Sequence, residues 1–440
     1  MNKYQNLYET LKKAILQGQY TYHQKIPSIR DMALQTSYSR TTIEAAYNQL
    51  LVEGYIVSVN KVGYFVDVDL KEQKETITLK KDMKQEKEIK YDYDFTGQAV
   101  DPKSFDMNVW KRYLKWTLNR EKDLFAYGDN QGEYHLRLAL LRYGRFYRGI
   151  QTEVENVIIG SGFQSLLTLL CGLCQDKKNV GIPESGFIYA QTIFEDFNKQ
   201  VVLLKEDEEG VKMDELKKYP IDLLYLNPSM SGKKAKPLSI SRRLEIIAYA
   251  NKKGIYLIED DHNGELRYLA KPVPAMQSQD TKHIIYIGSF SKLLIPSLRF
   301  AYMVLPDDLK EAYLKKKTLY HQNVSMIDQL TLAKYIEEGQ LIRQLKKCRR
   351  LYDKKSRTLF KKLKSCPYYK EIILEETSLR YRVYLSKKIN HDDFNDYCIK
   401  HQVGVLVLDE STLLFSFSSI PIEKIEAGLD LIEEYLKTVR

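Results

Sequence analysis

The chain of 440 residues lacks any continuous apolar run of about 18 residues, the length at which a helix becomes a candidate bilayer span. Its first residues, Met1-Asn2-Lys3-Tyr4-Gln5, lack the apolar core of a secretory signal peptide. Both absences argue against a membrane span and against export. We therefore expect a soluble cytoplasmic protein without a membrane partner.

Cysteine is scarce, with five residues in the chain. An odd number in a long sequence argues against a disulfide framework and favours a reducing compartment. Cys171 and Cys174 have the spacing of a redox or metal-binding pair, but they follow the apolar run 166–170. We interpret both as buried helix cysteines, and we expect no metal site.

Length and charge indicate how the chain is divided. A chain of 440 residues suggests two or three domains, and a net charge of +10 permits a polyanionic partner without requiring one. Residues 67–90 are dense in both charges and contain no aromatic residue, so they cannot bury enough surface to order themselves. We predict a small domain over residues 1–67, a charged flexible linker over 68–92 and a large domain over 93–440. A partner-docking role for the linker is the alternative.

Residues 1–67 have the pattern of a winged helix-turn-helix. Apolar residues at helical spacing predict a helix over 4–17, a second helix begins at Pro27, and Ser39 is a good N-cap for a third over 40–51. Two strand-like segments, 54–59 and 64–66, flank a short turn and predict a hairpin. The short turn 36–38 joins the second and third helices, as the motif requires.

This layout predicts DNA binding. Arg40 begins the candidate recognition helix, where an arginine can bond a guanine in the major groove, and Ser39 and Thr42 lie beside it. Arg30 and Lys61 suit phosphates, and Gly63 lets the wing backbone approach the duplex closely. The alternative is a small protein-interaction domain with solvated arginines.

A lysine-centred motif predicts the chemistry of the large domain. Lys292 lies among small hydroxyl residues after the apolar run 284–287, and Arg299 follows seven positions later. A lysine that forms a Schiff base needs an exposed, positioned amine, while hydroxyls and a guanidinium bind phosphate. The hydroxyls here are those of Ser289 and Ser291. These residues predict a site for pyridoxal 5'-phosphate (PLP), although Ser-x-Ser-Lys alone is a common sequence.

A second segment supports the same site. Residues 256–262 read as a buried strand that carries carboxylates at its C-terminal end, where α/β folds bind ligands. One carboxylate against the pyridine nitrogen of PLP would keep the ring protonated. Alternation of apolar runs with longer helical stretches across residues 93–440 indicates an α/β domain.

Both parts of the chain resemble known families. Residues 4–66, through Pro27-Ser28-x-Arg30-Asp31, Ser39-Arg40-Thr41-Thr42 and Glu53-Gly54-Tyr55, resemble the GntR-type winged helix. The remainder resembles fold-type I aminotransferases, through Tyr127-Gly128-Asp129-Asn130-Gln131-Gly132, Ser161-Gly162-x-Gln164 and Glu259-Asp260-Asp261. Joined by a linker, the two are similar to MocR/GabR-like transcriptional regulators. The resemblance implies a mostly parallel central sheet with a smaller α+β subdomain.

The resemblance also implies roles for single residues. Lys292 matches the Schiff-base lysine, Asp260 the acid against the pyridine nitrogen, and Arg299 the phosphate-binding arginine. Further matches are implied around the cofactor: Ser289 and Ser291 at the phosphate, Ser161, Gly162 and Phe163 at a helix N-terminus facing the phosphate, Phe187 stacked on the ring, Asn227 at the cofactor edge, and Tyr127 reaching the phosphate of the partner subunit. The last match implies a homodimer with the cofactor near its interface.

Two departures from the family pattern concern the ligand. His262 stands where the family has a tyrosine that bonds the PLP 3-hydroxyl. Leu414 stands where the family has an arginine that binds a substrate carboxylate, so this group is lost unless Arg380 or Arg382 replaces it. We expect common α-amino acids to be poor effectors, with PLP itself or an amine as the candidates.

The sequence therefore predicts a cytoplasmic, nucleoid-associated regulator that binds operator DNA and senses a small effector through PLP on Lys292. One alternative is an active PLP aminotransferase with a DNA-binding appendage. Another is a repressor whose large domain serves only for dimerisation. The lost arginine counts against the first alternative, and Lys292, Asp260 and Arg299 count against the second.

Overall fold

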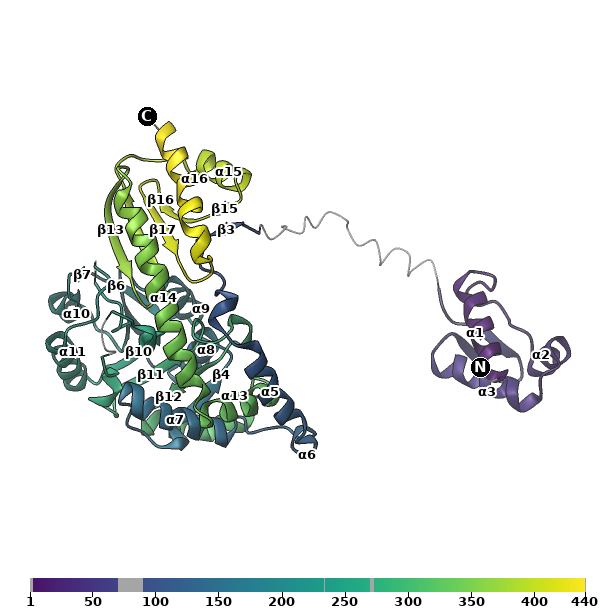
Figure 1. The fold of residues 1–440 in the computed structure, drawn as a ribbon. Coiled ribbons are helices and arrows are strands. Elements are labelled where there is room, and N and C mark those ends of the chain that lie inside the picture. Colours follow the sequence, from purple (N-terminus) through teal and green to yellow (C-terminus); the bar gives the residue numbers. More distant parts are fainter. Residues whose placement is uncertain (1–2, 70–89, 233, 270–272, 440) are drawn as a thin grey trace. The chain divides into compact units, whose positions relative to one another are not determined.

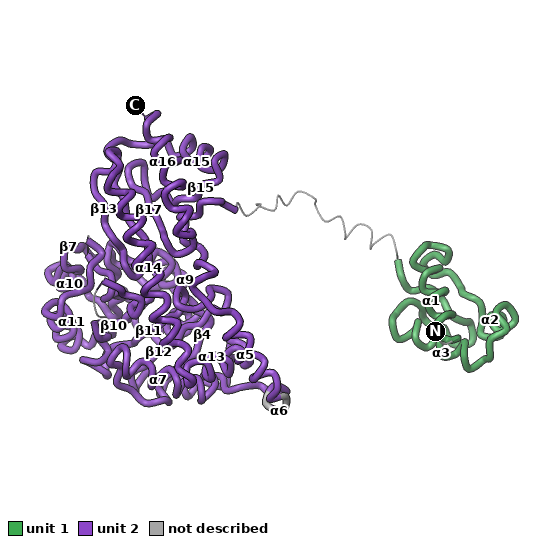
Figure 2. The backbone as a smooth tube through the Cα atoms, viewed as in Figure 1, with its two compact units in different colours: residues 1–88 green, residues 89–440 purple. Residues whose placement is uncertain are grey.

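The computed structural model describes residues 3–69, 90–232, 234–269 and 273–439. The chain divides into two compact units, residues 1–88 and 89–440 (Figures 1 and 2). Most of the predicted linker, residues 68–92, lies outside the described residues, and the predicted domain boundaries stay a prediction.

The first unit is the predicted winged helix. Its helices are α1 (Lys3–Leu16), α2 (Ile29–Thr36) and α3 (Arg40–Val52), followed by the antiparallel hairpin β1 (Ile56–Val59) and β2 (Gly63–Val66). Ser28 and Ser39 cap α2 and α3 by accepting hydrogen bonds from the backbone N–H groups of Asp31 and Thr42. The helices pack on one apolar core, which includes Ile15, Ile43, Tyr47 and Leu50.

The second unit is built on a seven-stranded sheet in the order β4-β12-β11-β10-β9-β5-β6. β12 (Ala301–Val304) runs antiparallel to both of its neighbours, β4 and β11. The other neighbouring strands of this sheet pair in parallel. The remaining strands are β4 (Val157–Gly160), β5 (Asn179–Pro183), β6 (Gln200–Leu204), β9 (Leu223–Leu226), β10 (Tyr256–His262) and β11 (Ile284–Ser289). The predicted mostly parallel sheet is confirmed.

Helices cover both faces of this sheet, and alternating side chains of each strand reach opposite faces. In β9, Leu223 and Tyr225 pack in the cluster with α8, α9 and α12, whereas Leu224 and Leu226 pack in the cluster with α10 and α11. The helices of this unit that precede α14 are α5 (Met107–Leu118), α6 (Glu121–Leu124), α7 (Tyr134–Arg148), α8 (Phe163–Leu173), α9 (Ile188–Asp196), α10 (Met213–Lys218), α11 (Ile240–Lys253), α12 (Asp307–Lys316) and α13 (Met326–Glu337).

A smaller antiparallel sheet follows in the order β13-β14-β17-β16. It is covered by α15 and α16, and β15 (Val403–Gly404) pairs separately with β3 (Tyr93–Asp94) at the start of the unit. Two further short strands, β7 (Glu206–Asp207) and β8 (Gly210–Val211), pair beside the large sheet. The elements of the smaller sheet and its helices are β13 (Tyr369–Glu375), β14 (Arg380–Leu385), β16 (Leu406–Asp409), β17 (Thr412–Ser416), α15 (His391–Lys400) and α16 (Ile425–Thr438).

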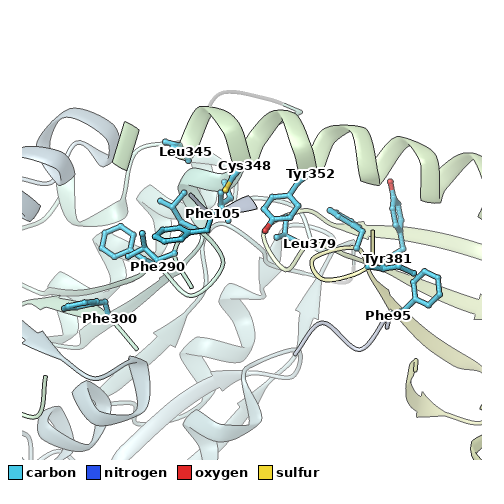
Figure 3. Packing of buried hydrophobic residues seen from close by; sticks show 14 of the residues in the cluster. Phe95, Phe105, Phe290, Phe300, Leu345, Cys348, Tyr352, Leu379 and Tyr381 are labelled. Carbon is cyan, nitrogen blue, oxygen red and sulfur yellow. The ribbon is translucent and has the colours of Figure 1, made fainter. Parts of the chain in front are cut away.

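The helix α14 (Gln340–Ser365) joins the two sheets through one continuous core. Figure 3 shows Phe290 and Phe300 near one part of this helix and Tyr381 and Phe95 near another, with Tyr352 between them. The smaller sheet is thereby held against the loop that carries Lys292.

The described residues also bear on the predictions for the cysteine pair and for membrane spans. As the sequence predicted, Cys171 is buried in α8 and Cys174 is buried at its C-cap, and both are free cysteines. No helix in the described ranges is long and apolar enough to cross a membrane.

Candidate functional site

The candidate site lies at the carboxyl ends of β9, β10 and β11. In β10, Ile258 packs in the α8 cluster, so alternation sends Asp260 and His262 to that same face. Tyr225 of β9 reaches this face too and donates a hydrogen bond to Asp260 at 2.6 Å. One buried carboxylate is thus directed toward α8.

The two neighbouring carboxylates are used elsewhere. Asp261, on the opposite face, accepts Arg148 Nη2 at 2.9 Å and the Tyr286 hydroxyl at 2.7 Å inside the core. Glu259 accepts the backbone N–H groups of Met276 and Gln277. Of the three consecutive acids, Asp260 alone faces the candidate site.

Asp260 is poised to respond to a basic partner. Its pKa is raised to about 7, chiefly by burial and also by the charges of Asp261 and Glu259, while the hydrogen bond from the Tyr225 hydroxyl opposes the increase. A cationic or basic nitrogen placed next to this carboxyl would restore its ionised form.

A cradle for an anion lies at the N-terminus of α8. Gly162 caps this 11-residue helix with φ +101°, and a Cβ atom built on it would lie 2.9 Å from Arg299 Nη2. Arg299 itself has φ +51°, an uncommon conformation that occurs at ligand sites. Backbone N–H groups at a helix start together with a guanidinium suit a phosphate.

The Lys292 amine is close to this cradle in sequence and is held by carbonyls of a distant segment. Its Nζ donates to the Gly97 oxygen at 2.5 Å, and the Ala99 oxygen and Ser418 Oγ both lie 3.4 Å away. The pKa of Lys292 is lowered to about 8, chiefly by burial and also by the charge of Arg380, while the charge of Asp94 opposes the decrease. The amine is therefore more readily available as a nucleophile than that of a surface lysine.

Ser289, Ser291 and His262 form a chain of polar contacts between the end of β10 and the loop that carries Lys292. Ser289 Oγ lies 3.2 Å from His262 Nδ1 and 3.4 Å from Ser291 Oγ. Burial lowers the pKa of His262 to about 4, and the charge of Lys292 lowers it as well. The imidazole is therefore neutral at pH 7, with Nδ1 directed at a hydroxyl.

Aromatic rings form one wall. Phe163, the first residue of α8, lies 5.9 Å from the Phe187 ring and 6.1 Å from the Tyr225 ring. Phe187 caps α9 and is 42% exposed, so part of its side chain is open to solvent. Tyr225 links this wall to the Asp260 carboxyl, because its ring contacts Phe163 and its hydroxyl donates to Asp260.

Three predicted site residues, Tyr127, Asn227 and Ser161, have surroundings that do not connect them to Lys292 or Asp260. Tyr127 is fully exposed on the segment before α7. Asn227 follows β9, and its side-chain oxygen accepts the Met230 backbone N–H at 3.1 Å. Ser161 precedes Gly162, and its N–H donates to Asn323 Oδ1 at 3.1 Å. Their predicted roles at a cofactor stay predictions.

The candidate DNA-reading residues are exposed around the start of α3. The Arg40 side chain is 82% exposed and its Nε donates to Glu44 at 2.8 Å. The Ser39 hydroxyl caps α3 and lies 2.7 Å from the Thr42 hydroxyl, so both hydroxyls already support the helix start. Arg30 is exposed in the first turn of α2.

The wing has a specific backbone conformation at its tip. Lys61 adopts φ +61° and Gly63 adopts φ +135°. A Cβ atom on Gly63 would lie 2.8 Å from Lys25 Cε, which gives this glycine a packing role in addition to its predicted one.

Sequence reasoning missed several residues of the site. Tyr225 was in a predicted strand, and its alternation with Leu224 could have indicated its face. Gly97 and Ser418 carry no local signal, because they reach the site only through tertiary contacts.

Comparisons with known proteins agree with this geometry. Residues 3–66 match the family described as bacterial regulatory proteins, gntR family. An uncharacterised HTH-type transcriptional regulator of Bacillus subtilis, YdeL, is 35% identical over 356 residues, covering 80% of this chain and 77% of the relative. The probable rhizopine catabolism regulatory protein MocR of Rhizobium meliloti is 28% identical and covers 79% of this chain and 74% of the relative.

The fold of the second unit is similar to that of an archaeal alanine:glyoxylate aminotransferase, with a TM-score of 0.71, 20% identity, and coverage of 80% of this chain and 92% of the other. A GntR-type winged helix followed by an aminotransferase fold defines a class of DNA-binding transcriptional regulators. The chain belongs to the MocR/GabR-like transcriptional regulators.

Proposed function

We propose that the second unit binds PLP through Lys292 and that this site controls DNA binding by the winged helix. The observation that carries the proposal is the partly buried Lys292 amine, with its pKa lowered to about 8, in the same domain as a helix-start cradle and the Asp260 carboxyl. PLP, when bound, supplies an aldehyde that condenses with an amine.

The residues present fit the cofactor. Arg299, Ser289, Ser291 and the N-terminus of α8 would hold the phosphate, since Gly162 leaves space that a Cβ atom would fill. Asp260 would accept the protonated pyridine nitrogen, and the partly exposed ring of Phe187 would lie against the cofactor face. The neutral His262 imidazole would take the place of the family tyrosine at the 3-hydroxyl.

A contact links this site to the segment that follows the linker. Lys292 donates to the carbonyl oxygens of Gly97 and Ala99, only a few residues after β3. A cofactor bound to Lys292 would compete for the amine that makes these two bonds, so the position of segment 97–99 would depend on whether the cofactor is bound. A ligand can regulate DNA binding in this way only if it favours one arrangement of the segment over the other.

The remaining partners follow from the same assignment. The winged helix binds operator DNA, with Arg40 at base edges and Arg30 and Lys61 at phosphates. Tyr127, fully exposed in the single chain, would reach the cofactor phosphate of a second copy in a homodimer. A chromosomal partner implies action in the cytoplasm.

An active aminotransferase is the second candidate function, favoured by the presence of Lys292, Asp260 and Arg299 in an aminotransferase fold. The position of Leu414 counts against it, because a buried leucine cannot bind the carboxylate of an amino-acid substrate there. We therefore propose a sensor rather than an enzyme.

The proposal is tested on purified full-length protein supplied with PLP. We expect a yellow absorbance band, and borohydride should fix the cofactor covalently to Lys292, as read by mass spectrometry. Lys292→Ala should show neither result, while Lys282→Ala, a lysine outside the site, serves as the matched control. Covalent fixation in Lys292→Ala would contradict the assignment.

A further inference from the structure

The long helix α14 carries a row of basic side chains along its exposed face. Exposed lysines and arginines recur at alternating intervals of four and three residues, the spacing that keeps side chains on one face of an α-helix. Seven residues form this row, here called the α14 basic stripe: Arg343, Lys347, Arg350, Lys354, Arg357, Lys361 and Lys364. At a rise of about 1.5 Å per residue, the stripe extends over about 32 Å.

The opposite face of α14 is fixed in the protein core. Leu341, Leu345, Tyr352, Leu359 and Leu363 are buried in the core that joins the two sheets. Figure 1 shows α14 as an uninterrupted helix at the front of the second unit. The basic side chains are therefore presented by a rigid helix rather than by a loop, and their spacing is set before any partner binds.

The positive charge of the stripe is largely uncompensated. Arg357 donates to Asp353 at 2.9 Å, and Asp353 is the one acidic residue of α14. Within the described residues, the other six side chains of the stripe form neither an ion pair nor a hydrogen bond. A solvated helix face usually mixes charges of both signs, whereas like charges at these intervals repel one another. An anionic partner would relieve this repulsion.

The length and charge of the stripe suit the phosphate backbone of a DNA duplex. One turn of B-DNA extends over about 34 Å, close to the length of the stripe. Each strand carries one phosphate for about every 3.4 Å of the duplex axis, and the stripe carries one cation for about every 5 Å of its own. Long basic side chains reach phosphate oxygens without reading the bases.

An anionic membrane surface fits the stripe less well. A helix that lies on a membrane inserts its apolar face between the lipids. The apolar face of α14 is occupied by the core of the protein, so this helix has no such face to insert. DNA therefore matches both the exposed and the buried side of α14.

We propose that the α14 basic stripe binds the phosphate backbone of DNA that flanks the operator held by the winged helix. The proposal goes beyond the proposed function and does not depend on the cofactor. Both units belong to one chain, so a duplex bound by the first is available to the second at a high effective concentration. The stripe adds affinity without sequence preference, because phosphates are the same in every sequence.

The test compares two duplexes bound by full-length protein. One is trimmed to a selected operator, and the other is extended on each side by about three helical turns of arbitrary sequence. Affinities are measured by anisotropy over a series of salt concentrations. Each neutralised phosphate adds about 0.9 to the slope of log affinity against log salt, so three contacts should steepen the slope by about 3. The gain from the extension should then shrink about 40-fold between 50 and 200 mM salt.

A triple variant removes the middle of the stripe. Lys347→Gln, Arg350→Gln and Lys354→Gln together should abolish most of the difference between the two duplexes. Glutamine is a good helix former and the three side chains are exposed, so α14 should remain folded, as circular dichroism checks. Extra non-specific sites on the longer duplex would help the wild type and this variant alike, so they cannot account for the loss.

A matched control separates the stripe from the overall charge of the protein. Lys252→Gln, Lys253→Gln and Lys315→Gln remove the same charge from exposed lysines of α11 and α12 and should keep the full effect of the extension. Arg350→Lys should keep it too, because contacts to phosphates depend mainly on charge.

Several results would overturn the inference. These are equal salt slopes for the two duplexes in the wild type, an undiminished difference in the folded stripe variant, or the same loss in the control. Should the stripe variant unfold, hydroxyl-radical footprinting of the wild type decides: protection of the backbone outside the trimmed operator is expected, and its absence would contradict the proposal. Binding to phosphatidylglycerol vesicles without any effect of the extension would assign the stripe to a membrane instead.

Discussion

Replacement of Gly162 by alanine should damage the phosphate cradle in two separable ways. Its φ of +101° with ψ of 173° is a conformation that essentially only glycine adopts, so alanine should destabilise the fold by about 1–3 kcal/mol. In addition, the new Cβ atom would lie 2.9 Å from Arg299 Nη2 and would force the guanidinium away. Loss of one charge-assisted hydrogen bond, about 1.5–3 kcal/mol, weakens PLP binding by about 10- to 150-fold.

Gly254 supplies a control for the first effect. It has φ +68° at the C-cap of α11, and no atom lies within 4 Å of a Cβ built there. Gly254→Ala should therefore cost about 1–2 kcal/mol of stability through the backbone alone and leave PLP affinity unchanged. Urea unfolding followed by circular dichroism measures the stability, and absorbance titration of apo-protein measures the affinity. If Gly162→Ala binds PLP as tightly as Gly254→Ala does, the cradle is wrongly assigned.

Three further predictions test other parts of the structure. The rate of PLP incorporation by apo-protein should rise with pH and level off above about pH 8. The reason is that the neutral Lys292 amine is the nucleophile and its pKa is lowered to about 8. A rate that still rises at pH 10 would contradict this prediction. Arg148→Met should destabilise the protein by about 3–5 kcal/mol in urea unfolding, since it leaves a buried carboxylate without its cation, whereas Arg145→Met, at a half-exposed site, should cost far less. In DNA-binding titrations, Arg40→Ala should lose about 1–3 kcal/mol and relax preference at one base pair, while Lys61→Ala should weaken all sequences alike and reduce the salt slope by about one; equal loss of discrimination in both would contradict this division.

Much of the fold followed from local patterns. The apolar runs of β10 and β11 predicted buried strands, and the acids that follow the apolar run of β10 indicated that carboxylates would stand at its C-terminal end. In the first unit, Ser39 predicted the start of α3 because its side chain satisfies a backbone N–H at that position.

The parts of the site that escaped prediction depend on contacts between distant segments. Lys292 meets Gly97 across 195 positions and Ser418 across 126 positions, and no local pattern records such a meeting. The same holds for Arg382, which comes to lie opposite Leu414 only through the β14–β17 register. The sequence left open whether Arg380 or Arg382 replaces the missing arginine, and the expectation of a carboxylate-free effector followed from Leu414 alone.

The central claim, that cofactor on Lys292 controls DNA binding, is tested most directly by one titration. A duplex selected from a random library by the full-length protein is labelled, and its affinity for apo-protein is followed by anisotropy as PLP is added. The account predicts a shift in the DNA dissociation constant that saturates together with the absorbance band and is absent in Lys292→Ala. A DNA affinity that stays the same at every PLP concentration, while the band reaches saturation, would contradict it.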